Sequence, residues 1–346
     1  MAAIHPFPPH RETDLLPDPG AIGHGAPAAN DAAVDPLAPT VFHEHWWLDT
    51  VTRGGWQAAE VRSDGKLAGW MPYVLSRQRG FRVSVMPPLT HLLGPVVPEG
   101  SGSSNTRWLR RLGILQELAA QLPRVAHFSQ TFHPDTADVL AFQSRGFETF
   151  TQFTAEVAPA TEALLWSHLR DKTRNVIRRA QEQCRVEAMG DPHEFLRFYL
   201  HNLEAAGERF YFDPSLLVPL VEAARSRHRG RVLVVRAPDG RPLAAVFYVW
   251  DRRRLWYFLS TRDPKDGHNG AVSLLVWRGL QMAAKHGLVF DFDGVAGEGA
   301  CRFYGSFGAR FVPRLAVWRR SPGYAFFRSA IELVRGRSGR NPFVAP

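Results

Sequence analysis

The feature that most constrains the fold of this chain is an order of secondary-structure segments that occurs twice. In residues 41–157, three strand-like segments come first, and a helix, a strand, a helix and a strand follow. Residues 162–318 begin with helical segments and then give the same order again. Alternating apolar and polar residues predict the strands, and apolar residues three to four positions apart predict the helices. The sequence therefore predicts an α/β (α+β) fold of two tandem domains, each with a mixed central sheet flanked by helices.

The expected elements follow from these patterns and from the turn-forming residues between them. In the first half we expect strands at 56–62, 67–76, 81–86, 125–129 and 147–157, and helices at 108–121 and 137–144. In the second half we expect helices at 162–183, 192–206, 214–227, 271–286 and 301–307, and strands at 231–236, 243–250, 254–260, 288–293 and 310–318. The halves share this order but little residue identity, which indicates a structural duplication.

Length and composition agree with a folded protein of this size. A chain of 346 residues is long enough for about two domains of roughly 150 residues. Apolar residues make up 45% and charged residues 22%, which excludes a mainly disordered chain. We expect a disordered leader at 1–39, an N-terminal domain at 40–158, a C-terminal domain at 159–320 and a basic amphipathic tail at 321–346.

The sequence disfavours several classes of protein. No apolar run approaches the roughly 18 residues that a membrane-spanning helix needs. Two cysteines, Cys184 and Cys301, are too few for a disulfide framework. His43 and His45 are two positions apart and do not share a helix face, so no metal site is expected there. No signal-peptide pattern is visible, and we therefore expect a cytoplasmic protein.

The formal net charge of +9 is concentrated in two segments. Residues 170–185 carry +4 and residues 314–346 carry +6, which leaves the rest of the chain close to neutral. Local basic elements of this kind favour an anionic partner, although solubility alone is an equally good reason for the basic tail. In the tail, apolar residues spaced 3, 4 and 3 apart from Tyr324 to Val334 predict an amphipathic helix. This helix would either lie on an anionic membrane or pack on the C-terminal domain. In the first case the protein would be peripheral at the inner face of the membrane.

A basic helix begins the second half. Arg170, Arg174 and Arg178 are spaced i, i+4, i+8 and would stack along one ridge beside an apolar stripe. Like charges at this spacing repel by a few tenths of a kcal/mol per pair unless an anion or carboxylates neutralise them. Arginine forks match phosphate oxygens, so the ridge suits a phosphate-bearing ligand. A solvated or salt-bridged helix face is the alternative.

Two further segments bear polar groups at the ends of expected strands. The loop from Ser260 to Ala271 joins a strand to a helix, and its glycines and basic residues suit an anion at the helix start, although such a loop is often only a connection. Asp291 and Asp293 lie on one side of the strand ending near Gly294, where substrates bind in open α/β sheets. One of these carboxylates suits a general base, and a turn-capping aspartate is the alternative.

These segments together resemble one family. The helix residues that match its L-x-x-K-x-R-x-x-I-R-x-A motif are Leu169, Lys172, Arg174, Ile177, Arg178 and Ala180. The later matches, in order, are Leu259-Ser260-Thr261, Asn269-Gly270-Ala271, Trp277, Asp291 to Val295, and Phe303 with Phe307-Gly308. The motifs resemble those of the Fem-type peptidyltransferases, a branch of the GNAT acyltransferase superfamily. The resemblance covers residues 160–320 well and implies two tandem GNAT-like domains.

Two acyl donors are known in this superfamily, and the resemblance leaves both open. Strict Fem-type enzymes use aminoacyl-tRNA and have a lysine after the first phenylalanine of an F-K-x-x-F-G motif, where this chain has Tyr304. Their GNAT relatives use acyl-CoA to acylate amines. The departure disfavours aminoacyl-tRNA, so we expect acyl-CoA as co-substrate. The resemblance also implies an amine acceptor on a sugar or a cell-envelope or polysaccharide precursor, because similar proteins are often found beside bacterial polysaccharide or cell-envelope genes. An aminoacyl-tRNA-dependent peptidyltransferase and a non-catalytic double-GNAT scaffold are the alternatives.

The residue roles follow from the chemistry that both donors share, attack of a neutral amine on an activated acyl group. We expect Asp293 as the proton acceptor and Tyr304 as a hydrogen-bond donor near the acyl carbonyl, although an aromatic at 304 is also a common packing residue. The expected binding residues for the donor, or for a nucleotide- or lipid-linked acceptor, are Lys172, Arg174, Arg178, Arg262, His268, Asn269, Gly270 and Arg302.

Overall fold

The computed structural model describes residues 38–136, 138–266 and 270–334. The N-terminal half contains η2 (Val41–His43), α1 (His45–Thr52), β1 (Trp56–Ser63), β2 (Lys66–Val74), β3 (Ser76–Gln78), β4 (Phe81–Ser84), α2 (Ser104–Gln121), β5 (His127–Thr131), α3 (Leu140–Gln143) and β6 (Glu148–Val157). The C-terminal half contains α4 (Glu162–His168), α5 (Asp171–Gln183), β7 (Arg185–Ala188), α6 (Pro192–Ala205), η3 (Pro214–Leu216), α7 (Leu217–Ser226), β8 (Gly230–Arg236), β9 (Pro242–Trp250), β10 (Arg254–Arg262), η4 (Pro264–Asp266), α8 (Ala271–Lys285), β11 (Val289–Asp291), α9 (Glu298–Gly305), β12 (Arg310–Arg320) and α10 (Pro322–Val334). The expected mixed α/β architecture is confirmed.

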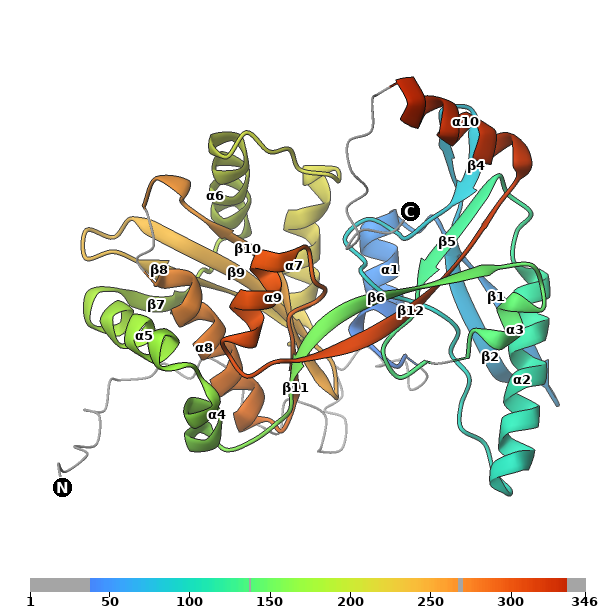
Figure 1. The fold of residues 1–346 in the computed structure, drawn as a ribbon, viewed down its shortest axis with the longest axis horizontal. Coiled ribbons are helices and arrows are strands. Elements are labelled where there is room, and N and C mark those ends of the chain that lie inside the picture. Colours follow the sequence, from blue (N-terminus) through green and yellow to red (C-terminus); the bar gives the residue numbers. More distant parts are fainter. Residues whose placement is uncertain (1–37, 137, 267–269, 335–346) are drawn as a thin grey trace.

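One mixed sheet runs through both halves. Its strand order is β3-β4-β5-β12-β6-β11-β10-β9-β8-β7, and β1 and β2 form a separate hairpin. The two halves meet at β6 and β12, which pair antiparallel from Glu148 with Trp318 to Glu156 with Arg310. The far end of β12 pairs with β5, and the end of β6 pairs with β11. The two strands therefore cross between the lobes of the molecule and belong to both (Figure 1).

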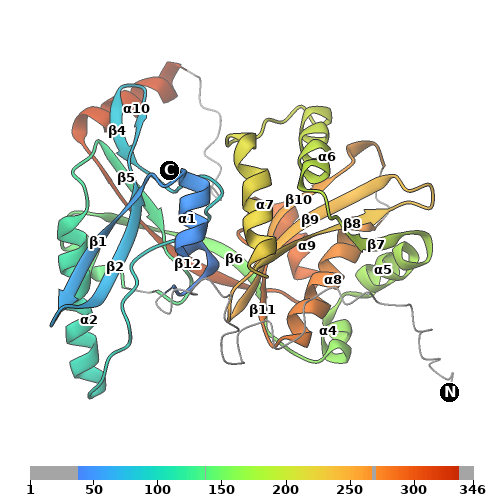
Figure 2. The same ribbon diagram turned by 180° about the vertical axis from the view of Figure 1, so that it is seen from behind.

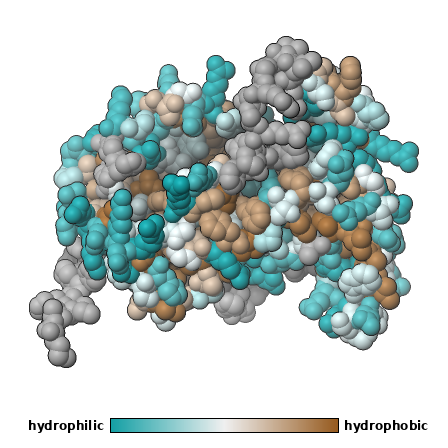
Figure 3. Space-filling view, viewed as in Figure 1, coloured by the Kyte–Doolittle hydropathy of each residue, from teal (hydrophilic) through white to brown (hydrophobic). Residues whose placement is uncertain are grey.

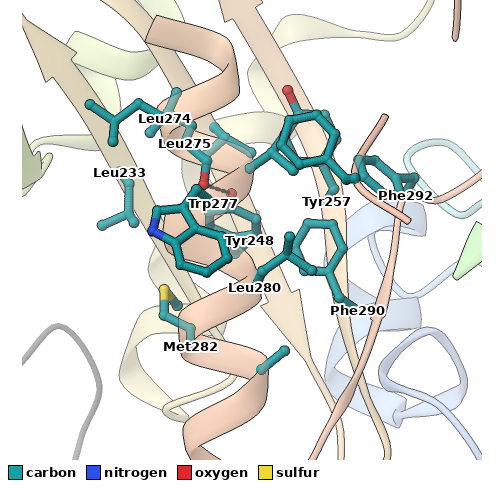
Figure 4. Packing of buried hydrophobic residues seen from close by; sticks show 14 of the residues in the cluster. Leu233, Tyr248, Tyr257, Leu274, Leu275, Trp277, Leu280, Met282, Phe290 and Phe292 are labelled. Carbon is teal, nitrogen blue, oxygen red and sulfur yellow. Dashed lines mark hydrogen bonds between the residues drawn. The ribbon is translucent and has the colours of Figure 1, made fainter. Parts of the chain in front are cut away.

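Helices cover both faces of the sheet in the C-terminal half. On one face, α4, α5 and α8 pack on alternate residues of β8 to β11, and Figure 4 shows Trp277 and Leu280 of α8 against Tyr248 and Phe290. The Tyr248 hydroxyl donates to the Leu275 carbonyl over 2.8 Å within this core. On the other face, α6 and α7 are joined by α1 from the N-terminal half, which lies beside α7 (Figure 2). A third core forms where α2 and α3 pack on β1, β2 and β5.

The shared strands have two different faces. Thr154 and Arg314 are buried on one face. Side chains alternate along a strand, so Phe153 and Phe311 point to the opposite face, where they are 48% and 40% exposed. Figure 3 shows apolar side chains gathered over this part of β6 and β12. At this crossing, Thr154 and Arg314 are thus turned inward, whereas Phe153 and Phe311 face outward.

The structure departs from the sequence expectations in the helix expected at 162–183. The chain is extended at Leu169 and Arg170, so α4 ends at His168 and α5 begins at Asp171. The Arg174 side chain donates to the carbonyls of Ser167 and Leu169, at 3.1 and 2.9 Å, and so satisfies groups that the end of α4 leaves unpaired. Arg170 therefore caps α5 and is not part of a helical ridge.

The first part of the tail forms the predicted helix, α10, and of the two alternatives, packing on the C-terminal domain is wrong. Its residues Tyr324 and Phe327 contact Phe81 of β4, with ring centroids 5.3 and 5.0 Å apart. Tyr324 also stacks on His127 of β5 at 5.2 Å. The long strand β12 carries the chain back to the N-terminal half, so α10 can reach only that lobe (Figure 1). Membrane contact by the tail stays a prediction.

No helix within the described ranges is both long and apolar enough to cross a lipid bilayer.

Candidate active site

Strands β10 and β11 diverge in the middle of the sheet. They pair in parallel only from Arg254 to Trp256 with Val289 to Asp291, although β10 continues to Arg262. After Asp291 the chain turns toward β6, and the Phe292 amide donates to the Ala155 carbonyl over 2.9 Å. The divergence opens at the carboxyl ends of both strands, which is where ligands bind in open α/β sheets.

A buried ion pair lies at the start of this divergence. Arg314 of β12 donates to both carboxylate oxygens of Asp291 at 3.1 Å, and the two side chains are 4% and 0% exposed. Thr154 of β6 also donates to Asp291, and its hydroxyl accepts from the Gly294 amide at 3.0 Å. Burial raises the pKa of Asp291, while the Arg314 guanidinium acts in the opposite direction. The pair holds the end of β11 in place.

Asp293 lies between two basic side chains. One of its oxygens pairs with Nδ1 of His91, and the other is 3.4 Å from Nη1 of Arg314. The Asp293 side chain is 1% exposed, whereas that of His91 is 29% exposed. Asp293 also has a left-handed backbone with φ of 60°, which costs energy in a residue other than glycine. Such strain is common at functional sites, where surrounding contacts hold it in place.

The polar network continues into the sheet. Nε of Arg254 lies 3.3 Å from a carboxylate oxygen of Glu156, and the guanidinium makes a two-pronged contact with Asp135 at 2.9 and 3.0 Å. Burial and the neighbouring Asp291 raise the pKa of Glu156. The hydrogen bond from Arg254 lowers the pKa of Asp135. The network draws on β6, β10, β11 and β12, so it fixes the geometry of the divergence.

Tyr304 of α9 lies on the other side of the diverging strands. Its ring stacks on Phe292 with centroids 4.1 Å apart, and it packs against the core that contains Tyr257. Burial, with the nearby Asp293 and Asp291 adding to it, raises the pKa of Tyr304 to about 12. The hydroxyl therefore keeps its proton at neutral pH and can act as a hydrogen-bond donor.

The basic residues of α5 occupy different surroundings. Arg174 binds the end of α4 and also pairs with Asp171, while Arg178 lies over the Trp166 ring at 5.5 Å. Lys172 is exposed beside a shallow hollow that Arg170 and Arg174 also line. A larger hollow of about 900 Å³ lies between α5, β7 and α8, and its lining includes Arg178, Arg185 and Arg278.

The remaining expected binding residues are scattered. Gly270 begins α8 with φ of 82°, and a Cβ there would lie 2.9 Å from the Val176 carbonyl, so glycine allows α8 to approach α5. Arg262 is exposed at the end of β10. Arg302 is exposed on α9 and pairs with Glu298. His268 and Asn269 lie outside the described residues.

Two important side chains escaped the sequence analysis. His91 follows a proline-rich segment of the N-terminal half, and Arg314 is one of many arginines near the C-terminus. His91 lies in the segment from Met86 to Pro95, which carries part of the family resemblance, whereas Arg314 belongs to no motif. Neither sequence context indicates Asp293 as a partner, because each contact with it forms only in the tertiary fold. Among the described residues, no cluster of three His, Cys, Asp or Glu side chains could hold a metal ion.

Comparison with known proteins finds one matching family model. Residues 167–304 match the family described as an acetyltransferase (GNAT) domain. That range includes β10, β11, α8 and most of α9, and so contains the diverging strands together with Asp291, Asp293 and Tyr304. This part of the chain is therefore similar to a GNAT acetyltransferase domain, as expected from the sequence. No curated protein matches the chain.

Two solved structures are similar to this chain in fold. The structure of FemX superposes with a TM-score of 0.61 at 13% identity, covering 85% of this chain and 94% of FemX. A Bacteroides thetaiotaomicron protein of unknown function superposes with a TM-score of 0.50 at 12% identity, covering 79% of this chain and 91% of that protein. The fold is the Fem-like arrangement of two GNAT-like halves, and the expected resemblance is confirmed.

Proposed function

We propose that this protein is an N-acyltransferase that transfers an acyl group from acyl-CoA to an amine of a sugar or cell-envelope or polysaccharide precursor. The observation that carries the proposal is the divergence of β10 and β11, with the Asp293 cluster on one face and Tyr304 on the other. Backbone groups of β10 beyond Trp256 lack a β11 partner, and an extended acyl donor can hydrogen-bond to such a strand edge.

The hollow between α5 and α8 supports a donor that carries phosphates. Its lining includes Arg178, Arg185 and Arg278, against Glu182 as its acidic residue. Guanidinium groups bind phosphate oxygens strongly, and the hollow lies on the same face of the sheet as α9 and Tyr304. The donor would therefore place its anionic end beside α5 and its acyl group at the divergence.

Asp293 and Tyr304 would then act on different groups, the attacking amine and the acyl carbonyl. Attack of an amine on a thioester needs a group that receives the amine proton and a donor for the oxyanion that develops on the carbonyl. Asp293, which is paired with His91 in a buried polar cluster, would contribute to accepting the amine proton. The protonated Tyr304 hydroxyl would donate to the oxyanion.

The fold shared with FemX favours a second candidate, an aminoacyl-tRNA donor. Thermal unfolding in the presence of acetyl-CoA, longer acyl-CoAs and charged tRNA separates the two. A ligand at 100 times its Kd adds about 2.7 kcal/mol of stability, which is easily seen as a rise in Tm. We expect a rise with acyl-CoA, and an alanine variant of Arg178 should reduce it. A rise in Tm with charged tRNA alone would mean that the donor is aminoacyl-tRNA and not acyl-CoA.

Turnover with the donor that raises Tm tests the proposed roles of Asp293 and Tyr304. We expect Asp293→Asn and Tyr304→Phe each to lower kcat at least tenfold, because each removes a group needed in the transition state. Tyr211→Phe is the control, since Tyr211 is 91% exposed. Full turnover in both site variants would show that the roles are wrong.

A further inference from the structure

We propose that His91, contributed by the N-terminal half, is the group that takes the proton from the attacking amine, and that Asp293 holds its ring. This inference rests on the proposed acyl transfer and assigns its general base. It makes the active site a joint product of both halves, although the family match covers only residues 167–304.

The surroundings of Asp293 favour an indirect role for its carboxylate. One oxygen is paired with His91 and the other faces Arg314, and the side chain is 1% exposed. An incoming amine would have to displace one of these partners to reach a carboxylate oxygen. His91, at 29% exposed, is the member of the pair that a substrate can reach.

The pairing also determines which nitrogen of His91 is available. The carboxylate accepts a hydrogen bond from Nδ1–H, so the lone pair of the neutral ring is on Nε2. A buried carboxylate on Nδ1 orients the imidazole and stabilises the imidazolium that forms when Nε2 takes a proton. Arg314 and Asp291 hold Asp293 from behind.

The ring of His91 lies at the diverging strands. Its centroid is 5.0 Å from that of Phe258, which is two residues beyond the last β10 residue paired with β11. Phe258 belongs to the core on the α1 and α7 face, whereas Tyr304 packs on the core of the opposite face. The amine would thus approach from the His91 face and the acyl donor from the Tyr304 face, so neither blocks the other.

The step balances with an acyl thioester as the co-reactant. The amine nitrogen forms a bond to the carbonyl carbon, and its proton passes to Nε2 of His91. The carbon–sulfur bond then breaks, and the thiolate takes that proton from His91. An amide and a free thiol result, and the imidazole returns to its neutral form.

A carboxylate and two aromatic rings surround the imidazole of His91. Asp293 follows β11 and contacts Nδ1, with Asp291 and Arg314 behind it. The rings of Phe42 from η2 and Phe258 from β10 pack on the imidazole at centroid distances of 6.3 and 5.0 Å. The imidazole is therefore held by a carboxylate at Nδ1 and by two aromatic rings.

The experiment uses the full chain, acetyl-CoA and glucosamine as probes, and release of free thiol as the readout. We expect His91→Ala to lower kcat at least 100-fold, with little change in KM for acetyl-CoA or in Tm. Added imidazole should raise the kcat of this variant at least tenfold. Asp293→Asn should lower kcat at least tenfold, because the imidazolium loses the carboxylate that orients and stabilises it. His201→Ala, at an exposed histidine of α6, is the matched control.

The experiment distinguishes an error in the role of His91 from an error in the proposed function. A wild type that releases thiol, with His91→Ala equally active, would overturn the role of His91 and leave the proposed acyl transfer intact. A wild type that neither releases thiol nor binds any acyl-CoA would contradict the proposed function itself. Nuclear magnetic resonance of the His91 Nδ1 proton is independent of turnover. Its signal should be far downfield in the wild type and move upfield in Asp293→Asn, and an unchanged signal would contradict the pairing.

Discussion

At the scale of single residues, Arg314 is the group on which two buried carboxylates depend. It contacts Asp291 at 3.1 Å and Asp293 at 3.4 Å, and all three side chains are almost inaccessible to solvent. Breaking a buried ion pair by removing one partner is costly, because the other charge remains buried without compensation. Arg314 therefore supports both the fold and the position of Asp293.

We predict that Arg314→Gln lowers the free energy of unfolding by about 3–5 kcal/mol. Arg310→Gln should change it by less than about 0.5 kcal/mol, because Arg310 is exposed on the same strand. Chemical denaturation of the two variants measures the difference. Equal stability of both variants would mean that Asp291 and Asp293 need no positive partner.

A second pair of residues, His43 and His133, makes stability depend on pH. Their rings are 5.7 Å apart, and both side chains are buried. Burial lowers the pKa of His133 to about 4 and also lowers the pKa of His43. Within the described residues, Nε2 of His43 and Nδ1 of His133 have no hydrogen-bond partner, so protonation would add unsatisfied charge to the core.

Stability should therefore fall as the pH drops from 6.5 toward 4. In this range the unfolded chain protonates His133 while the folded protein keeps it neutral, so the unfolded state binds more protons. Between pH 6.5 and 5 the loss is about 2 kcal/mol from this residue alone. Denaturation at several pH values should show a flatter dependence in His133→Gln, whereas the exposed His201→Gln keeps the wild-type slope. Identical slopes in all three proteins would exclude His133 as the cause.

At the scale of an element, α10 is stabilised by only a few buried contacts. Tyr324 is 6% exposed and lies between Phe81 and His127, whereas Phe326 on the same helix is 78% exposed. A short amphipathic helix depends on tertiary packing more than on its own propensity. The stability of α10 should therefore depend on the side chain of Tyr324 and hardly on that of Phe326.

We predict that Tyr324→Ala destabilises the protein by about 2–4 kcal/mol and that Phe326→Ala changes stability by less than about 0.5 kcal/mol. Amide hydrogen exchange should show faster exchange across α10 in the first variant only. If both variants exchange alike, the contacts of Tyr324 do not hold the helix.

At the scale of the whole molecule, the two halves share a core. Phe42 and Trp47 precede the first strand, yet they pack with Trp256 and Phe258 of β10, and the Phe42 and Trp256 ring centroids are 5.2 Å apart. The shared strands β6 and β12 join the halves in the same region. Neither half can therefore be removed without exposing buried apolar surface of the other.

We predict that the protein unfolds in one transition and that Phe42→Ala destabilises all of it by about 3–5 kcal/mol. Circular dichroism and tryptophan fluorescence should give coincident curves in the wild type and the variant. The control is Leu109→Ala, since Leu109 is 61% exposed on α2. Two separated transitions, with only one of them moved by Phe42→Ala, would show that the halves fold independently.

Much of this architecture could be predicted from the sequence, because most elements are decided by local patterns. The continuous apolar run of β9 and the apolar spacing of α8 are strong signals, and the structure has both elements within a residue or two of the expected bounds. The strand β7 was not expected, since four residues of mixed polarity carry little periodicity. The break between α4 and α5 was also missed, because it depends on how the Arg174 side chain binds the carbonyls that end α4.

The sequence by itself determined the order of the elements, the GNAT-type motifs and the positions of Asp293 and Tyr304, because these are encoded by neighbouring residues. Only the tertiary structure decided that His91 and Arg314 meet at Asp293, since they are 202 and 21 positions away along the chain. It also decided that β6 and β12 belong to both halves and that α10 packs on the N-terminal one. Contacts over such separations depend on strand pairing and burial of the whole chain, which local periodicity does not record.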